Sequence, residues 1–120
     1  MNEARAAIAD LDRELRKVGE DIVLQRLVTD PDTGAQSPSY IANCRANVRA
    51  HQPQELQFMA GEAPVTVIVL SPTDLARELW PGLPQKDDRA IVQGRSANVE
   101  IVSPIYVGGT LVRIDLQTRE

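Results

Sequence analysis

The chain contains one pair of adjacent aspartates, Asp87 and Asp88, in the segment LPQKDDR. Paired carboxylates bind Mg²⁺ or divide the roles of general acid and general base in several classes of enzyme. Adjacent side chains on an extended backbone point apart, however, and a turn rich in Asp and Lys is typically solvated. We therefore expect a solvated turn here. An enzyme that combines Asp87, Asp88 and His51 around a metal ion is the alternative that these residues leave open.

Other residues that carry chemistry are scarce, since His51 is the only histidine and Cys44 the only cysteine. A histidine with no second histidine and no cysteine nearby does not form a metal site. No neighbouring motif lowers the pKa of Cys44, which we expect to be a small core residue. The motifs GxGxxG, GxxxxGK[ST], GxSxG, HExxH and CxxC are missing. The sequence predicts a protein that is not an enzyme and that uses no cofactor and no metal.

The charge and the aromatic content argue against a nucleic-acid-binding protein. The formal net charge is −4, and the chain has only four aromatic residues: Tyr40, Phe58, Trp80 and Tyr106. Binding of DNA or RNA normally needs basic side chains that neutralise phosphates and aromatic side chains that stack on bases. A small barrel that binds oligonucleotides is nevertheless kept as an alternative, because small barrels often have that function.

The length of 120 residues predicts one domain, residues 1–120, with a core that needs no disulfide. The N-terminal segment mixes charged residues into its apolar ones, which excludes the core of a signal peptide. The longest apolar run near mid-chain, VTVIVL, is too short to span a bilayer. A single cysteine gives no sign of an oxidising compartment. We expect a soluble intracellular protein.

The first 18 residues predict an amphipathic helix, with Gly19 as its stop. The apolar residues follow alternating steps of four and three: Ala4, Ile8, Leu11, Leu15 and Val18. The opposite face is charged, so the apolar stripe must lie on another surface. Either the helix packs on its own sheet, or it docks on another subunit through Ile8, Leu11 and Leu15.

After the helix, the apolar period changes to two, which is typical of strands. DIVLQRLV is the first expected strand, and DPDTGAQSPS, residues 30–39, is an expected polar loop. The second strand places alternate residues on one face, with Cys44 pointing inward: Tyr40, Ala42, Cys44, Ala46 and Val48. PVTVIVL shows almost no polar alternation, so we expect both of its faces to be covered.

The connection AHQPQELQFMAGEAP interrupts this periodicity and is long for a loop in a compact domain. We expect it to form a projecting loop over residues 50–63, while the barrel takes up residues 20–120. Phe58 and Met59 either fold back onto the core or form a contact surface for a partner. His51 is expected to be a solvated loop residue.

SPTDLARELWPGLP predicts a short helix with Ser71 as N-cap and Pro72 in the first turn. Leu75 and Leu79 are expected on its inner face. The last third predicts strands joined by a type II′ turn at Gly94-Arg95 and a type I′ turn at Gly108-Gly109, with Pro104 marking an edge or a bulge. Six short antiparallel strands indicate a mainly β fold, closed as a small barrel or a rolled sandwich.

Two segments, GEDIVLQRL and WPGLPQKDDRAIVQGRSANVEIVSPIYVGGTLVRIDLQ, resemble the head-tail joining proteins of long-tailed bacteriophages, in the head-closure or stopper group. The shared pattern is an early strand after Gly-Glu-Asp and a mid-chain strand. An Asp-Arg then leads into a strand, followed by a glycine, V..V.PI and a terminal hydrophobic hairpin strand. Adaptors and tail-completion proteins of the virion are alternatives with a related structural pattern.

The resemblance implies a non-enzymatic β-barrel protein that forms a ring with copies of itself in the virion neck, after assembly in the cytoplasm of the bacterial host. Portal and adaptor proteins would lie above the ring and tail proteins below it. The ring would close the DNA channel after packaging and provide the platform for the tail. Double-stranded DNA would pass through it without specific binding, and no membrane is involved.

In that group the loop after the second strand projects toward the channel, which maps here onto residues 50–63. The resemblance thus implies a set of candidate channel and gating residues: His51, Gln52, Gln54, Glu55, Gln57, Phe58 and Met59. The segment from Asp30 to Ser39 competes with it for this role.

Overall fold

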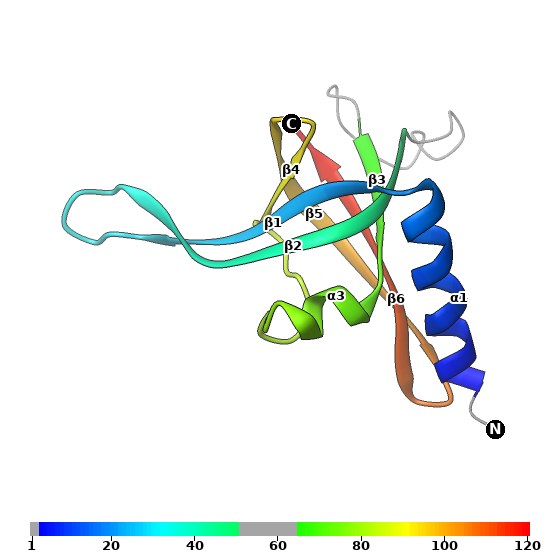
Figure 1. Cartoon of the computed structure of the whole chain (residues 1–120). Coiled ribbons are helices and arrows are strands. Elements are labelled where there is room, and N and C mark those ends of the chain that lie inside the picture. The colour runs from blue at the N-terminus through cyan, green and yellow to red at the C-terminus, as the bar shows by residue number, and fades with distance from the viewer. Residues whose placement is uncertain (1–2, 51–64) are drawn as a thin grey trace.

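The computed structural model describes residues 3–50 and 65–120, which contain two helices and six strands (Figure 1). Their bounds are α1 Glu3–Val18, β1 Glu20–Thr29, β2 Gln36–Ala50, β3 Val65–Leu70, α3 Pro72–Arg77, β4 Arg89–Val92, β5 Arg95–Val107 and β6 Thr110–Arg119. Neither helix is long and apolar enough to cross a membrane.

The six strands form a closed antiparallel barrel in the order β1-β2-β3-β6-β5-β4. Strands that follow each other along the chain are neighbours, except that α3 and its connection separate β3 from β4. Pairing of β3 with β6 and of β4 with β1 closes the barrel. The prediction of a mainly β fold with six antiparallel strands, an N-terminal helix and a short helix after the mid-chain strand is confirmed.

The barrel core consists of alternate residues from its strands, as expected for half-buried strands. Eleven strand residues contribute buried side chains to the core cluster: Ile22, Leu24, Ala42, Cys44, Ala46, Ile68, Leu70, Ala90, Val99, Ile114 and Leu116. β3 departs from the alternation, because Val65, Val67 and Val69 on its other face are buried as well. This confirms the expectation that both faces of β3 are covered, and also that Cys44 points inward.

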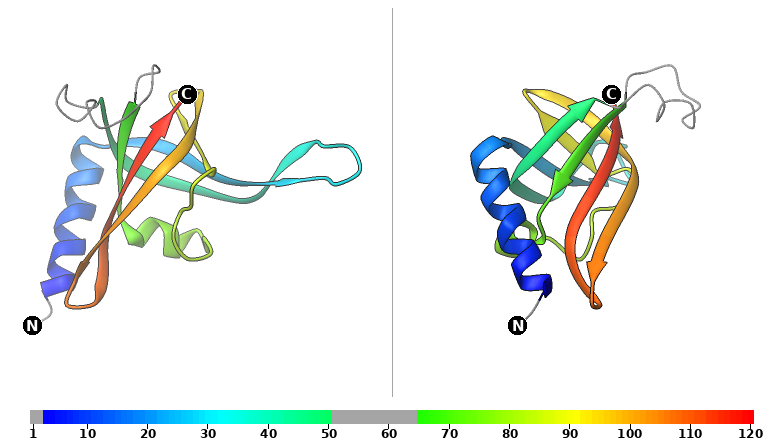
Figure 2. Two further views of the ribbon diagram at one scale, coloured as in Figure 1. Left: turned by 180° about the vertical axis from the view of Figure 1, so that it is seen from behind. Right: turned by 90° about the vertical axis from the view of Figure 1, so that its right-hand side faces the viewer.

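Helix α1 lies alongside the barrel against β6 and β2 (Figure 2). Ala4 and Leu15 are buried, and Ile8 and Leu11 are half-buried, so the apolar stripe packs on the chain's own sheet. Val18 does not belong to this contact, contrary to the prediction, because its side chain is 59 % exposed. The helix ends at Val18 and the chain turns away into β1, which carries this residue past the barrel surface.

Arg45 of β2 fastens the end of α1 to the barrel. Its Nε donates to the carbonyl oxygen of Leu15 at 2.9 Å, and its Nη2 donates to that of Arg16 at 3.5 Å. The last carbonyls of a helix have no partner inside the helix and carry the negative end of its dipole, so a guanidinium is favourable there. The direction of α1 is therefore tied to β2.

The two tight turns of the last third differ in how well the sequence predicts them. The turn between β5 and β6 has Gly108 at φ +57° and Gly109 at φ +82°, which confirms a type I′ turn. The prediction of a type II′ turn at Gly94-Arg95 is wrong. Gln93 and Gly94 are the turn residues, with φ of +52° and +79°, and they form a second type I′ turn. Arg95 already belongs to β5, where it pairs with Val92.

Strand β5 has a free edge over most of its length, because β4 pairs only with the segment from Arg95 to Asn98. Its pairing with β6 shifts register between Val99 and Ile101 and again between Ile105 and Tyr106. Pro104 lies between these two irregularities. The expectation of an edge at Pro104 is confirmed, whereas the irregularities lie on either side of Pro104, which itself pairs with Ile114. A proline on such an edge removes a backbone donor and so discourages pairing with another chain.

The short helix α3 begins as predicted, since the side chain of Ser71 accepts a hydrogen bond from the backbone N–H of Thr73 at 3.2 Å. Its end differs from the prediction. Leu75 is buried, but Leu79 is 82 % exposed and adopts φ +59°. The N–H of Trp80 donates to the carbonyl of Leu75, and the N–H of Leu79 donates to that of Ala76. This is the hydrogen-bond pattern of a Schellman cap, in which Leu79 holds the left-handed position that glycine usually takes.

Replacing Leu79 by glycine is expected to raise the free energy of unfolding by about 1 kcal/mol, because a leucine pays a steric penalty in the left-handed region. The side chain is almost entirely in solvent, so its loss removes little apolar burial. Urea unfolding of the purified protein measures the change. Leu79→Ala is the matched control: it removes the same side chain but keeps a Cβ at φ +59°, and so gains little. Equal stability of both variants would contradict the backbone explanation.

Candidate functional site

The most prominent surface feature is a β-hairpin arm that extends from the barrel, visible in Figure 1 and Figure 2. We define the arm as residues 27–41. β1 remains paired with β2 as far as Thr29, opposite Gln36. The pairing of β1 with β4 ends at Gln25, and the pairing of β2 with β3 begins only at Ala46. The arm is therefore a two-stranded ribbon with two free edges.

The expected loop at residues 30–39 is wrong in its bounds, because β2 already begins at Gln36. Only residues 30–35 form the connection. All side chains from Val28 to Ile41 are exposed, including Val28, Tyr40 and Ile41, which are each about half exposed. An isolated two-stranded ribbon is marginally stable in water. The arm must therefore be stabilised at its tip, at its base or by a partner.

The tip of the arm is held by its own hydrogen bonds. The N–H of Asp30 donates to the carbonyl of Ala35, and the N–H of Gly34 donates to the carbonyl of Asp30, each at 2.8 Å. The side chain of Asp30 also accepts from the N–H of Asp32 at 2.8 Å, as in an Asx turn. Gly34 adopts φ +75°, where glycine is favoured. The tip thus has a defined shape without any other part of the chain.

The base of the arm is fastened by a buried ion pair between Arg26 and Asp88. Nε and Nη2 of Arg26 each donate to one carboxylate oxygen of Asp88 at 2.9 Å. Nη2 also donates to the carbonyl of Leu83 at 3.2 Å, and Asp88 accepts from the N–H of Gln85 at 2.7 Å. Asp88 is 4 % exposed. The hydrogen bond to Asp88 raises the pKa of Arg26 above its ordinary value, so the guanidinium stays charged.

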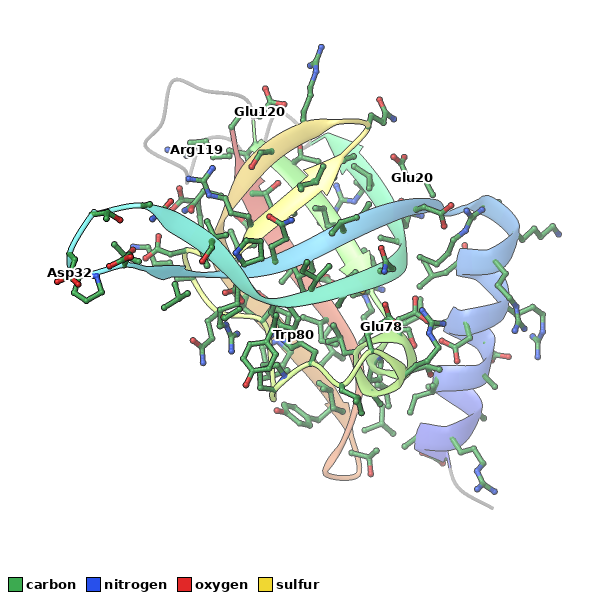
Figure 3. All side chains as sticks on the ribbon, turned by 60° about the vertical axis from the view of Figure 1, so that its left-hand side comes forward. Glu20, Asp32, Glu78, Trp80, Arg119 and Glu120 are labelled. Carbon is green, nitrogen blue, oxygen red and sulfur yellow. The ribbon has the colours of Figure 1, made fainter. Side chains whose placement is uncertain are left out.

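Two aromatic residues complete this contact, and we call Arg26, Asp88, Trp80 and Tyr40 together the arm lock. The guanidinium of Arg26 lies 4.9 Å from the centroid of the Trp80 ring. Tyr40 meets that ring edge to face, with centroids 6.4 Å apart. Trp80 is 6 % exposed and lies below β2, between the arm and α3 (Figure 3). The lock joins β1 and β2, at the base of the arm, to the connection between α3 and β4.

The prediction of a solvated Asp87-Asp88 turn is wrong for Asp88. Asp87 is exposed and accepts a hydrogen bond from the side chain of Asn98 at 3.2 Å, whereas Asp88 is turned inward to Arg26. Arg26 stands 62 positions earlier in the chain, so no local pattern signals this pairing. Within residues 3–50 and 65–120, no group of three or more His, Cys, Asp and Glu residues could hold a metal ion.

Carboxylates from α3 and the turn after it cover the edge of β2 next to the arm. The N–H of Asn43 donates to Glu78 at 2.8 Å, and the N–H of Arg45 donates to Asp74 at 2.7 Å. The hydrogen bonds from the backbone and then the side chain of Asn43 hold the pKa of Glu78 below its usual value. Since exposed strand edges invite pairing with other chains, this arrangement protects β2 up to the point where the arm begins.

A surface groove with a volume of about 700 Å³ lies over the outer face of β4, β1 and β2, between α3 and the last turn of α1. We call it the outer groove. Val23 and Ile91, both half-buried, contribute apolar surface to it. Charged residues of both signs line it as well: Asp12, Arg16, Asp21, Arg45, Asp74 and Arg77. Such a mixed surface with an apolar floor is suited to a protein contact.

The predicted site residues fall into two groups. The candidate channel residues from His51 to Met59 lie outside the described residues. Of the candidate docking residues on α1, Leu15 is buried against the barrel, while Ile8 and Leu11 are half-buried there. The arm lock and the outer groove were not foreseen, because each combines residues that are distant in the sequence.

Cys44 lies in the core rather than at a reactive site. Burial raises the pKa of its thiol to about 12, with smaller contributions from Asp74 and Glu78. The thiolate is the nucleophilic form of cysteine. The thiol therefore stays protonated and chemically inert at neutral pH in the folded protein.

No protein-family model matches the chain, and a comparison with curated proteins finds no similar sequence.

Proposed function

We propose that this protein is a non-enzymatic structural component of the virion neck of a long-tailed bacteriophage. Copies of it form a ring below the portal and adaptor proteins, close the DNA channel after packaging and provide the platform for the tail. The proposal rests on the resemblance of its first strand and its C-terminal third to head-closure proteins, and on the surface features of the chain.

The observation that carries the proposal is the arm. It extends from a small closed barrel, adds nothing to the barrel core and exposes Val28, Tyr40 and Ile41, yet its tip and its base are held in place. A ribbon of this kind is suited to contacting another subunit. Head-to-tail contacts, which build rings, need two different surfaces on each subunit, and the arm and the outer groove are two such surfaces.

The charge of the chain supports passage of DNA rather than its retention. A chain with a net charge of −4 has no excess of cations to neutralise phosphates, whereas a basic lining would bind the duplex that must later slide past. In this proposal residues 50–63 are the channel loop, with His51, Phe58 and Met59 among its candidate gating residues.

Electron microscopy of phage particles whose copy of this gene has been deleted tests the proposal. Heads that package DNA, lose it and remain tailless are the expected result. Normal tailed particles would overturn the proposal. Heads that keep their DNA but lack only the tail would move the protein to the tail-completion layer, and so would contradict the closure role.

A further inference from the structure

We infer that the arm of one copy docks on a second copy of this chain, in the outer groove and against the last turn of α1. This inference rests on the ring of the proposed function and names the surfaces that would build it.

The first reason to expect this docking is exposed apolar surface on both the arm and the receiving side. Val28, Tyr40 and Ile41 of the arm are each about half exposed, although one edge of the Tyr40 ring meets Trp80 in the arm lock. The receiving side has the matching feature, because Val18 at the end of α1 is 59 % exposed and Val23 in the groove is half-buried. Apolar surface on both sides would be removed from water if the two surfaces met, which favours their association.

Charge is the second reason, and it selects which surface receives the arm. Asp30 and Asp32 give the arm two negative charges, and no Lys or Arg lies within residues 27–41. Arg16 and Lys17 in the last turn of α1 are exposed, and neither makes an ion pair with any described residue. Two uncompensated anions on the arm thus match two uncompensated cations beside the groove.

The positions of the two surfaces set the type of contact. The arm and α1 lie at opposite ends of the molecule, which measures 52 Å along its longest axis (Figure 1). An arm that reaches the α1 end of the next copy makes a head-to-tail contact, which leaves the arm of that copy free to repeat it. Contacts of this type close into rings or continue as filaments.

Side chains rather than an added strand make this contact. Pro38 in the arm and Pro104 on the free edge of β5 each remove a backbone donor from an exposed edge. The arm extends roughly 16 Å from Leu27 to its tip at about 3.3 Å per residue.

Cross-linking between two single-cysteine variants tests the contact. Asp32→Cys and Lys17→Cys proteins, each also carrying Cys44→Ser, are mixed and treated with a short bismaleimide at up to about 1 mM protein, so that weak pairs are populated. A cross-linked dimer is expected from the mixture and not from either variant alone. Lys86→Cys replaces Lys17→Cys in the control, because Lys86 is exposed on the connection between α3 and β4. Absence of the mixed dimer, or equal yield with the control, would overturn the inference.

Charge reversal provides an independent measurement by light scattering of the full-length protein. Reversing Asp32 to Lys, or Arg16 and Lys17 to Glu, is expected to weaken association about tenfold or more, and combining all three changes should restore it. Lys86→Glu is the control, since Lys86 is exposed on the connection between α3 and β4. Failure of the combined variant to recover would contradict the inference.

These experiments separate the contact from the proposed function. If the mixed dimer forms but deletion of the gene leaves normal particles, the neck function fails and the contact stands. If deleted particles leak DNA while arm variants associate like the wild type, the contact fails and the neck function stands. Capture of the arm by a portal or tail protein, without the mixed dimer, would also overturn the inference.

Discussion

Replacing Asp88 by asparagine is expected to lower the free energy of unfolding by about 3 kcal/mol, because the guanidinium of Arg26 then stays largely buried without its counter-charge. The change corresponds to a fall in melting temperature of roughly 10 °C for a domain of this size. Urea unfolding followed by tryptophan fluorescence is a suitable measurement. Trp80 is the only tryptophan, and its ring lies 4.9 Å from the guanidinium of Arg26, so its emission reports on the lock directly.

Asp87→Asn is the matched control for this prediction, since it makes the same chemical change one position earlier. Asp87 is exposed and adopts φ +76°, a conformation that asparagine tolerates. We expect a change of no more than about 0.5 kcal/mol. A second control, Arg26→Met combined with Asp88→Asn, should recover part of the loss, because no unpaired guanidinium remains. Similar losses for Asp87→Asn and Asp88→Asn would contradict the importance of the ion pair.

The arm lock affects the direction of the arm as well as stability. A buried ion pair is often no more stabilising than a well-packed apolar pair of similar volume. Its fixed geometry, with two hydrogen bonds from one guanidinium to one carboxylate, restricts orientation more than an apolar contact does. We interpret the Arg26–Asp88 pair as the element that fixes the angle between the arm and the barrel. Asp88→Asn should therefore also lower the yield of the cross-link between Asp32→Cys and Lys17→Cys proteins.

The sequence predicts the parts of this fold that depend on local patterns. The period-two alternation identifies the inward position of Cys44, the glycine pair at positions 108 and 109 identifies a type I′ turn, and Ser71 identifies a helix start. Each of these features depends on residues that are close together along the chain. Burial of alternate residues and backbone conformation at glycine are consequences of local chemistry.

The features that the sequence does not reveal depend on contacts between distant segments. Asp88 has the neighbours of a solvated turn residue, and only the approach of Arg26 from β1 makes it a buried counter-ion. The polar composition of residues 30–39 is typical of a loop, although residues 36–39 already belong to β2. Leu79 follows the helical spacing of Leu75, but the cap after α3 turns it into solvent. The candidate site is built from these contacts and was largely missed.

Replacing Gly19 by alanine is expected to lower the free energy of unfolding by about 3 kcal/mol, because overpacking against rigid backbone is costly. A Cβ at this position would overlap the carbonyl oxygen of Leu15 and lie 2.9 Å from that of Ala46. Neither oxygen belongs to a side chain that could rotate away. Gly19 therefore allows the last turn of α1 to approach β2 closely, and the approach also positions Leu15 for its hydrogen bond from Arg45.

Hydrogen exchange distinguishes a local from a global effect of Gly19→Ala. Displacement of α1 should remove protection from residues 4–18 while β1 to β6 retain most of theirs. Gly34→Asn is the control: Gly34 adopts φ +75°, but no atom lies within 4 Å of an added Cβ, and asparagine tolerates this conformation. Gly34→Asn should lower the free energy of unfolding by no more than about 1 kcal/mol. If Gly19→Ala lowers the free energy of unfolding no more than Gly34→Asn does, the close packing of α1 on β2 does not require a glycine at position 19. The last turn of α1, which is part of the receiving surface for the arm, would then be held less firmly than inferred.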